Sequence, residues 1–209
     1  MFETYSHSQT RRERRIAARK FQILDAAASI FSQKGYQNTT TKEIAAAASV
    51  SEGTLYNYFA NKRELLIGVA QAYADEVVTD IESVQGESFE DMLSQIMANR
   101  FRRGRERRLF MLFLHESRLN ADVYQYYVEE TMHRIIDVTE QRVRALIKQG
   151  QMRPVDPEIA GRMMSATIMG FAALFELGMT LDQASPESLG AQITDIFLNG
   201  LRARPEDDG

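Results

Sequence analysis

The chain of 209 residues contains no cysteine. Without cysteine it can form neither a disulfide framework nor a thiolate site. It also lacks an N-terminal apolar segment of the signal-peptide type and any apolar run near the roughly twenty residues that a membrane helix needs. We therefore expect a cytoplasmic protein of bacterial or archaeal type that has no membrane partner.

Motifs of common enzyme sites are missing as well. The sequence has no Gly-rich phosphate loop, no Gly-x-Ser-x-Gly turn and no clustered His, Asp and Glu. His115 and His133 each stand alone, with no partner at metal-ligand spacing. We therefore expect no catalytic residue, no metal and no cofactor, and we do not expect an enzyme.

Helix start and stop signals recur along the whole chain, whereas no segment shows the sustained alternation of a strand. The signals are N-cap residues, prolines at the first helical position and glycines after the last turn. In the C-terminal two thirds they stand at Ser88, Gly104, Asn120, Gly150, Asp156-Pro157 and Ser185-Pro186. The sequence predicts an all-α fold of about nine helices.

Three further helix starts fall close together in the N-terminal third. Thr40 with Glu43 has the spacing of a capping box, in which the hydroxyl accepts one free N–H and the carboxylate another. Ser51 is a good N-cap, and Asn61 with Glu64 repeats the capping-box spacing. Together these signals predict two short helices joined by a tight turn and followed by a longer helix.

The second short helix has one narrow apolar side, formed by Leu55 and Phe59. Its other side carries hydroxyl and amide groups, which can bond phosphates or base edges, and a glycine that permits close backbone approach. These residues are Glu52, Gly53, Thr54, Tyr56, Asn57 and Tyr58. The alternative interpretation is an ordinary solvated helix with two partly buried tyrosines.

The charge distribution favours a polyanionic partner. Residues 1–66 hold ten Lys or Arg against six Asp or Glu, a net charge of +4, whereas residues 67–209 hold fifteen against twenty-three, a net of −8. Six of the basic residues lie between Arg11 and Lys20. A basic run can also be a solubilising tail, but this one adjoins the helix pair, and a positive region steers a protein toward a polyanion.

Five segments of this region match one known family. They are Ile23-Leu24-Asp25-Ala26-Ala27 with Phe31, Lys34-Gly35-Tyr36, Thr40-Thr41-Lys42-Glu43-Ile44-Ala45, Val50 to Phe59, and Asn61 to Leu66. Together they resemble the DNA-binding domain of the TetR family of transcriptional regulators. One departure is Ser49, where the family usually has glycine; in a left-handed conformation serine costs up to about 1 kcal/mol relative to glycine.

The resemblance implies a helix-turn-helix DNA-binding domain at residues 21–66. A basic N-terminal arm would precede it at residues 1–20, and a helical effector-binding and dimerisation domain would follow at residues 67–209. Basic arms of this kind enter the minor groove beside the recognition helix. The arginines of the arm that we assign to DNA are Arg11, Arg12, Arg14 and Arg15.

The resemblance also implies particular DNA contacts. The matching positions are Thr41, Lys42, Gly53, Thr54, Tyr56, Asn57, Tyr58 and Lys62. The first two would meet phosphates, with Lys42 also able to reach a base edge, while Gly53, Thr54 and Asn57 would face the major groove. The two tyrosines match positions that contact the DNA backbone. Lys62 would clamp a phosphate at the start of the longer helix.

The last two helices are candidates for a homodimer interface, since one carries a line of small residues and the other an apolar stripe. Reading adjacent major grooves requires two recognition helices about 34 Å apart, which a dimer provides. The candidate interface residues are Ala166, Gly170, Ala173, Ile193, Phe197 and Leu201. The alternative for each is ordinary intramolecular core.

Methionines and aromatic residues of the middle helices suggest an adaptable apolar pocket, although they equally suit a packed core. The pocket candidates are Met97, Phe101, Phe110, Phe113, Tyr124, Tyr127, Met164 and Phe171. A nearby arginine cluster is either a solvated face or a holder for the acidic end of an amphipathic effector, such as an acyl-thioester or carboxylate. Its members are Arg100, Arg102, Arg103, Arg105, Arg107 and Arg108.

Taken together, these features predict a DNA-binding transcriptional regulator. We expect a repressor that binds a palindromic double-stranded operator as a homodimer and is released by a small lipophilic effector. The alternative is an architectural DNA-binding protein that responds to no effector.

Overall fold

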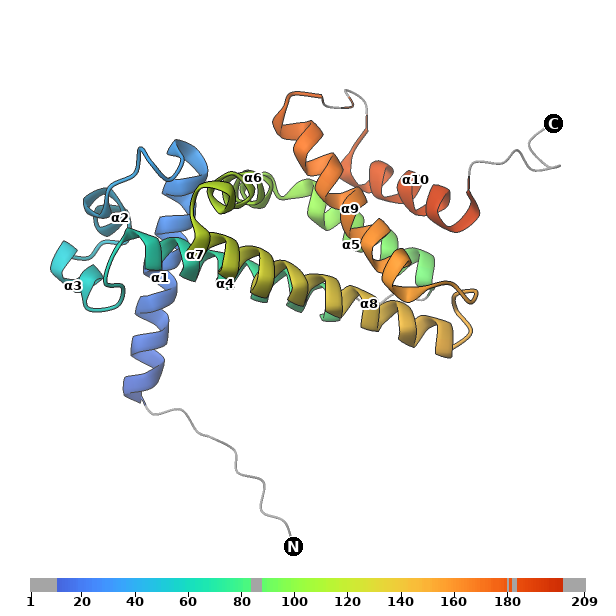
Figure 1. Ribbon diagram of the computed structural model, residues 1–209, viewed down its shortest axis with the longest axis horizontal. Helices are drawn as coiled ribbons and strands as arrows, with labels where there is room; N and C mark the ends of the chain where they lie inside the picture. Colours follow the sequence, from blue (N-terminus) through green and yellow to red (C-terminus); the bar gives the residue numbers. More distant parts are fainter. Residues whose placement is uncertain (1–10, 84–87, 180, 182–183, 201–209) are drawn as a thin grey trace, which may run out of the picture. The chain divides into compact units, whose positions relative to one another are not determined.

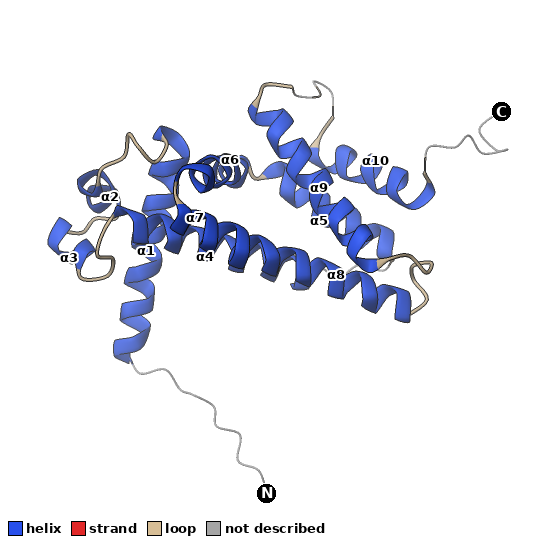
Figure 2. Ribbon diagram, in the orientation of Figure 1, coloured by secondary structure: helices blue, strands red, loops and turns tan. Residues whose placement is uncertain are grey.

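The computed structural model describes residues 11–83, 88–179, 181 and 184–200 (Figure 1). These residues form helices and connecting loops, without strands (Figure 2). The helices are α1 (Arg11–Lys34), α2 (Thr41–Ala47), α3 (Glu52–Tyr56), α4 (Lys62–Ser83), α5 (Phe89–Arg102), α6 (Gly104–Leu119), α7 (Ala121–Tyr124), a π-helix (Gln125–Met132), α8 (His133–Lys148), α9 (Pro157–Glu176) and α10 (Pro186–Asn199). Because α7, the π-helix and α8 follow one another without a break, the described part of the chain has nine helical segments, and the all-α prediction is confirmed. None of the described helices is long and apolar enough to cross a membrane.

The chain forms two compact units, residues 1–72 and residues 73–209. The core of the first unit is built from one side of each of its helices. Its buried residues include Ile23, Ala27 and Phe31 of α1, Ile44 and Ala45 of α2, Leu55 of α3, and Leu65 and Leu66 of α4. These apolar residues recur at helical spacing, so each helix turns one stripe inward and leaves its polar side to solvent.

The predicted helix starts of the first unit are present in the structure. Thr40 and Glu43 form the reciprocal capping box, and Ser51 Oγ accepts from the Thr54 N–H at 3.0 Å. At the start of α4, Asn61 Oδ1 accepts from the Glu64 N–H at 2.9 Å, but the Glu64 carboxylate accepts from the preceding residue, Ala60, rather than from Asn61.

Two backbone features of the first unit extend the sequence interpretation. Ser49 has φ +51°, so the turn between α2 and α3 does require the left-handed conformation that glycine adopts without strain. The basic residues from Arg11 to Lys20 form the first turns of α1, so the described part of the N-terminal arm is helical. Residues 1–10 lie outside the described part.

The second unit buries a cluster of methionine, leucine, isoleucine and phenylalanine side chains between α5, α8, α9 and α10. Its fully or nearly buried members are Met92, Leu93, Ile96, Met97, Phe101, Leu146, Leu189 and Ile193. The predicted N-caps Ser88, Asp156 and Ser185 accept backbone N–H groups at the starts of α5, α9 and α10. Asn120 makes no such capping bond; its amide donates to the Glu116 carboxylate instead, at 3.0 Å.

Gly190 allows α10 to pack directly on the backbone of α5. A Cβ atom built on Gly190 would lie 2.7 Å from the Ser94 carbonyl oxygen and 3.0 Å from the Ala98 amide nitrogen. Both are backbone atoms, so the clash cannot be relieved by a side-chain rotation.

We therefore expect Gly190→Ala to lower the free energy of unfolding by about 1–3 kcal/mol, since overpacking forces the two helices apart. Chemical denaturation monitored by circular dichroism measures the change. Gln192→Ala, at an exposed position of the same helix, is the matched control and should change it by less than about 0.5 kcal/mol. An unchanged Gly190→Ala protein would contradict the close packing of α10 on α5.

Candidate nucleic-acid interface and effector cavity

Helix α3 has only five residues, and its apolar side fixes it to the first unit. Leu55 is fully buried, and Phe59, just beyond the helix, is nearly so. The Leu55 N–H donates to the Ser51 carbonyl at 3.0 Å, and the Phe59 N–H donates to the Leu55 carbonyl at the same distance. The helix is therefore held by its packing and its cap, since a single turn does not persist alone in water.

The opposite side of α3 is open to solvent. Gly53 and Asn57 are exposed, and Tyr56 is 46% exposed. A Cβ on Gly53 would meet only Ser51 Oγ, at 3.9 Å, so the protein's own packing does not require glycine here. A bare backbone beside an exposed amide suits close approach to another surface.

A hydrogen-bond network joins the start of α2 to α3. The Thr41 hydroxyl donates to Glu52 Oε1 at 2.6 Å, and the Tyr56 hydroxyl lies 3.1 Å from the same Thr41 oxygen. Because Thr41 has given its only hydroxyl proton to Glu52, it accepts from Tyr56. Thr41 therefore fixes the start of α2 to α3. The sequence interpretation assigned Thr41 to a DNA phosphate and did not include this structural role. Thr54 is likewise paired, with Ser51 Oγ at 2.8 Å.

Lys62 also has internal partners. Its ammonium group donates to the carbonyl oxygens of Tyr36 and Thr39, both at 2.8 Å, and lies 4.4 Å from the centre of the Tyr36 ring. Two of its three protons are thereby used to join the start of α4 to the loop after α1. Lys42, by contrast, is exposed.

The capping carboxylate of α2 stays ionised over the whole physiological pH range. A hydrogen bond from the Lys34 ammonium, with further ones from the Thr40 N–H and hydroxyl, lowers the pKa of Glu43 to about 2. The carboxylate of the α2 capping box is therefore charged at and around neutral pH.

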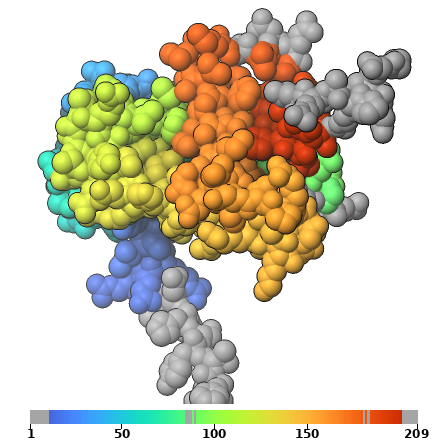
Figure 3. Space-filling model, turned by 45° about the vertical axis from the view of Figure 1, so that its right-hand side comes forward, coloured from blue at the N-terminus to red at the C-terminus, as the bar shows by residue number. Residues whose placement is uncertain are grey.

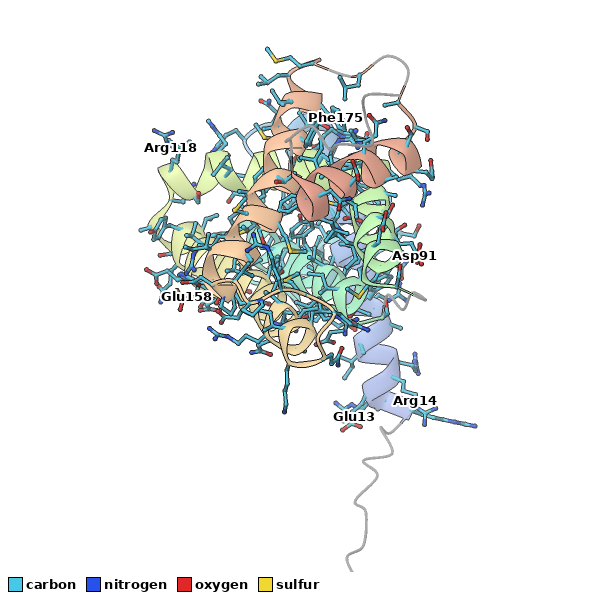
Figure 4. The ribbon with its side chains drawn as sticks, turned by 90° about the vertical axis from the view of Figure 1, so that its right-hand side faces the viewer. Glu13, Arg14, Asp91, Arg118, Glu158 and Phe175 are labelled. Carbon is cyan, nitrogen blue, oxygen red and sulfur yellow. The ribbon has the colours of Figure 1, made fainter. Side chains whose placement is uncertain are left out.

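The basic turns of α1 form a hollow surface together with Tyr58. The hollow encloses about 640 Å³ and is lined by Arg11, Arg12, Arg15, Ile16, Ala18, Arg19, Gln22 and Tyr58. Arg14 and Glu13 lie at the same end of α1, with their side chains on different sides of the helix (Figure 4). One side of the first unit thus combines exposed cations with hydroxyl and amide groups, which are the groups that bind DNA phosphates and bases.

The second unit contains an apolar cavity of about 80 Å³ between α4, α5, α8 and α9. Of the residues predicted for a pocket, Met97, Phe110 and Met164 line it. The sequence interpretation did not include lining residues from α4 and α8, among them Tyr73 and Arg142. Burial raises the pKa of Tyr73 to about 12, so this phenol stays neutral.

The other predicted pocket residues do not line this cavity. Phe113 and Tyr127 pack on each other, with ring centres 4.8 Å apart, and Tyr124 is 47% exposed. Phe101 and Phe171 pack edge to face at 5.4 Å within the core. The structure thus brings three of the eight predicted residues to an apolar cavity, whereas most of the predicted aromatic rings fill space against one another.

The arginine cluster on α5 and α6 is largely an ion-paired network. Arg100 is buried and pairs with Asp80 and with Glu106, the latter at 2.9 Å. Arg103 also reaches both of these carboxylates, at 2.7 and 3.0 Å. Burial raises the pKa of Glu106, although the two arginines oppose this shift. Arg102 and Arg107 pair with Glu187 and Glu176. These four arginines therefore have carboxylate partners within the protein.

The candidate interface residues fall into two groups. Ala166 and Gly170 are exposed and Ala173 is partly exposed, all on α9, which lies on the outside of the second unit (Figure 3, orange). Ile193 is buried, and Phe197 packs against the same core on α10. Ile193 is therefore intramolecular core rather than interface, because its stripe faces α5. Leu201 lies outside the described residues.

Comparison with known proteins agrees with this arrangement. Residues 23–69 match the model of the bacterial regulatory proteins of the tetR family. The chain is 26% identical over 188 residues to the HTH-type transcriptional regulator YhgD of Bacillus subtilis, covering 88% of this chain and 97% of the relative.

Two solved structures share the fold. The fatty acid degradation regulator FadR of Bacillus halodurans superposes with a TM-score of 0.73 at 23% identity, over 87% of this chain and 99% of that one. FadR of Bacillus subtilis, in complex with stearoyl-CoA, does so with a TM-score of 0.69 at 20% identity, over 87% and 99%. The relatives are transcriptional regulators and not enzymes. These comparisons confirm the resemblance to the TetR family of transcriptional regulators that the helix pair predicted.

Proposed function

We propose that the protein is a repressor that binds a palindromic operator as a homodimer and is released by a small lipophilic effector. The observation that carries the proposal is the exposed polar side of α3, fixed by Leu55 and set in the same unit as the basic turns of α1. In this arrangement Asn57 and Gly53 enter the major groove, while Lys42 and the α1 arginines meet the backbone.

The outer side of α9 supports the dimer. Exposed apolar or small residues recur on it every three or four positions: Ile159 (61%), Met163 (55%), Ala166, Gly170, Leu174 (41%) and, just beyond the helix, Leu177 (67%). Gly170 lies between them, and a Cβ built there would meet no atom within 4 Å. A continuous apolar stripe of this kind is typical of a surface that another protein covers. A second copy of α9 is its natural partner, since it presents the same stripe.

The cavity supports a lipophilic effector. Its wall is formed mainly by methionine, leucine, isoleucine and valine side chains, which adapt to a flexible alkyl chain. One protein of the same fold, FadR of Bacillus subtilis, was solved in complex with stearoyl-CoA. An effector of this kind releases DNA only if it binds the DNA-free state more tightly than the DNA-bound state.

The DNA contacts are tested by comparing Asn57→Ala with Lys42→Gln. Asn57→Ala should weaken binding to the selected operator by about 10- to 100-fold and hardly change binding to random DNA, because a base contact is lost. Lys42→Gln should weaken both and lower the salt slope by about one, because a phosphate contact is lost. Fluorescence anisotropy over a salt series measures both effects.

Lys148→Gln, at an exposed position of the second unit, is the control for the loss of one positive charge and should bind DNA normally. If Asn57→Ala weakened operator and random DNA equally, the assignment of Asn57 to a base would be wrong.

The dimer is tested by Gly170→Gln. Within the protomer the new side chain meets open space, so the protein should fold normally, but it should block close approach of two α9 helices. We expect sedimentation equilibrium to show a dimer for the unaltered protein and a monomer for the variant, with operator affinity falling at least tenfold. Ala121→Gln, a similar enlargement at an exposed position of α7, should remain dimeric. A dimeric Gly170→Gln protein would exclude α9 from the interface.

Operator release is tested with DNA sequences selected from a random pool. In a gel-shift assay the selected palindrome should bind at least about a thousandfold more tightly than random DNA. Stearoyl-CoA should release it, whereas coenzyme A without an acyl chain should not. Equal binding to both DNAs would favour the architectural alternative, and specific binding that no acyl compound reverses would refute the effector.

A further inference from the structure

Arg142 places a positive charge on the apolar face of α8. It follows Ile135 and Thr139 and precedes Leu146 at helical spacing, and all four residues line the cavity of the second unit. The side chain is partly buried. A cation in such a stripe is unusual, because burial of charge is unfavourable unless an anion accompanies it.

The protein supplies no such anion within its described residues. The Arg142 guanidinium donates through Nη2 to the Met92 thioether sulfur, at 2.7 Å, and its buried Nε has no hydrogen-bond partner. A thioether is a weak acceptor and carries no charge. Among the ion pairs formed by described residues, none includes Arg142, whereas Arg100, Arg103 and Arg107 each have at least one carboxylate.

Two other polar residues of the cavity wall, Thr139 and Arg100, have partners within the protein. The Thr139 hydroxyl donates to the Ile135 carbonyl at 2.9 Å. Arg100 also lines the cavity, but its terminal nitrogens pair with Asp80 and Glu106. An anion in the cavity would therefore meet its strongest uncompensated donor at Arg142.

We propose that Arg142 binds the anionic end of an amphipathic ligand whose alkyl chain lies in the cavity against α5 and α9. A guanidinium offers two parallel N–H groups to a carboxylate or phosphate, a geometry that a thioether does not use. The ligand displaces the Met92 sulfur from the guanidinium and places its apolar chain toward Met97 and Met164. That this ligand is the effector rests on the proposed function. That it binds at Arg142 does not depend on the proposed function.

The arrangement has a consequence for stability in the absence of ligand. Because Arg142 is partly buried without an anion, Arg142→Met should raise the melting temperature of the unliganded protein. Arg100→Met, which leaves Asp80 and Glu106 without their buried partner, should lower it. A residue that merely supported the fold would behave like Arg100.

The test measures binding of decanoate, 1-decanol and decanoyl-CoA by calorimetry, without DNA. The protein should bind decanoate at least about tenfold more tightly than the alcohol, and Arg142→Gln should abolish that preference. Arg142→Lys should keep part of it. Arg144→Gln, at an exposed position two residues along the same helix, is the matched control and should bind as the unaltered protein does.

The outcomes of these binding measurements distinguish failure of the Arg142 site from failure of the proposed effector response. If only decanoyl-CoA binding depends on Arg142, the anion is a phosphate of the nucleotide, and the proposed role of Arg142 stands. If Arg142→Gln binds both anionic compounds as tightly as the unaltered protein, or if neither compound binds, the inference is wrong. If they bind through Arg142 but leave the operator complex intact, the inference holds and the effector part of the proposed function fails.

Discussion

The anchoring of α3 by one apolar side is the constraint on which the DNA-binding unit depends. A five-residue helix gains too few hydrogen bonds to offset the cost of nucleation, so its position is set by the burial of Leu55 and by the Ser51 cap. The other side chains of the helix are partly or fully exposed. The Thr41–Glu52–Tyr56 network adds a polar tie to α2 and keeps the exposed side rigid. A rigid, exposed polar face requires little ordering when it meets DNA.

The two units use charge in opposite ways. In the first, the α1 arginines line an open hollow, so their field acts on whatever approaches from solvent. In the second, Asp80 and Glu106 face Arg100 and Arg103, and this network holds α4, α5 and α6 together. Arg142 fits neither pattern, since it is partly buried and, among the residues that the structure describes, has only the Met92 thioether as a side-chain hydrogen-bond partner. The anionic ligand that we propose would give this charge its partner.

Local signals in the sequence predicted helix ends well, because a cap depends on residues within one turn. The Thr40–Glu43 box, the left-handed Ser49 and the Asp156-Pro157 start are all of this kind. Which apolar face meets which helix is a tertiary property, and periodicity does not contain it. The apolar stripe of α10 therefore predicted Ile193 at a dimer interface, although the residue faces α5 in the structure. The π-helix before α8 has no recognisable signal in the local sequence. Arg142, by contrast, can be recognised in the sequence, because it is a charged residue within the apolar stripe of α8.

Helix α9 connects the two proposals about the second unit. Its inner side, with Met164, Ser165 and Ile168, forms part of the cavity wall, and its outer side carries Met163 and Gly170 in the apolar stripe. Helices in a close-packed interior shift as rigid bodies rather than deform locally. A chain that enters the cavity must therefore move α9 or its neighbours, and any movement of α9 changes the surface offered to a second protomer. Ligand binding and dimer geometry can thus be coupled directly, because one side of α9 lines the cavity and the other side forms the proposed dimer surface.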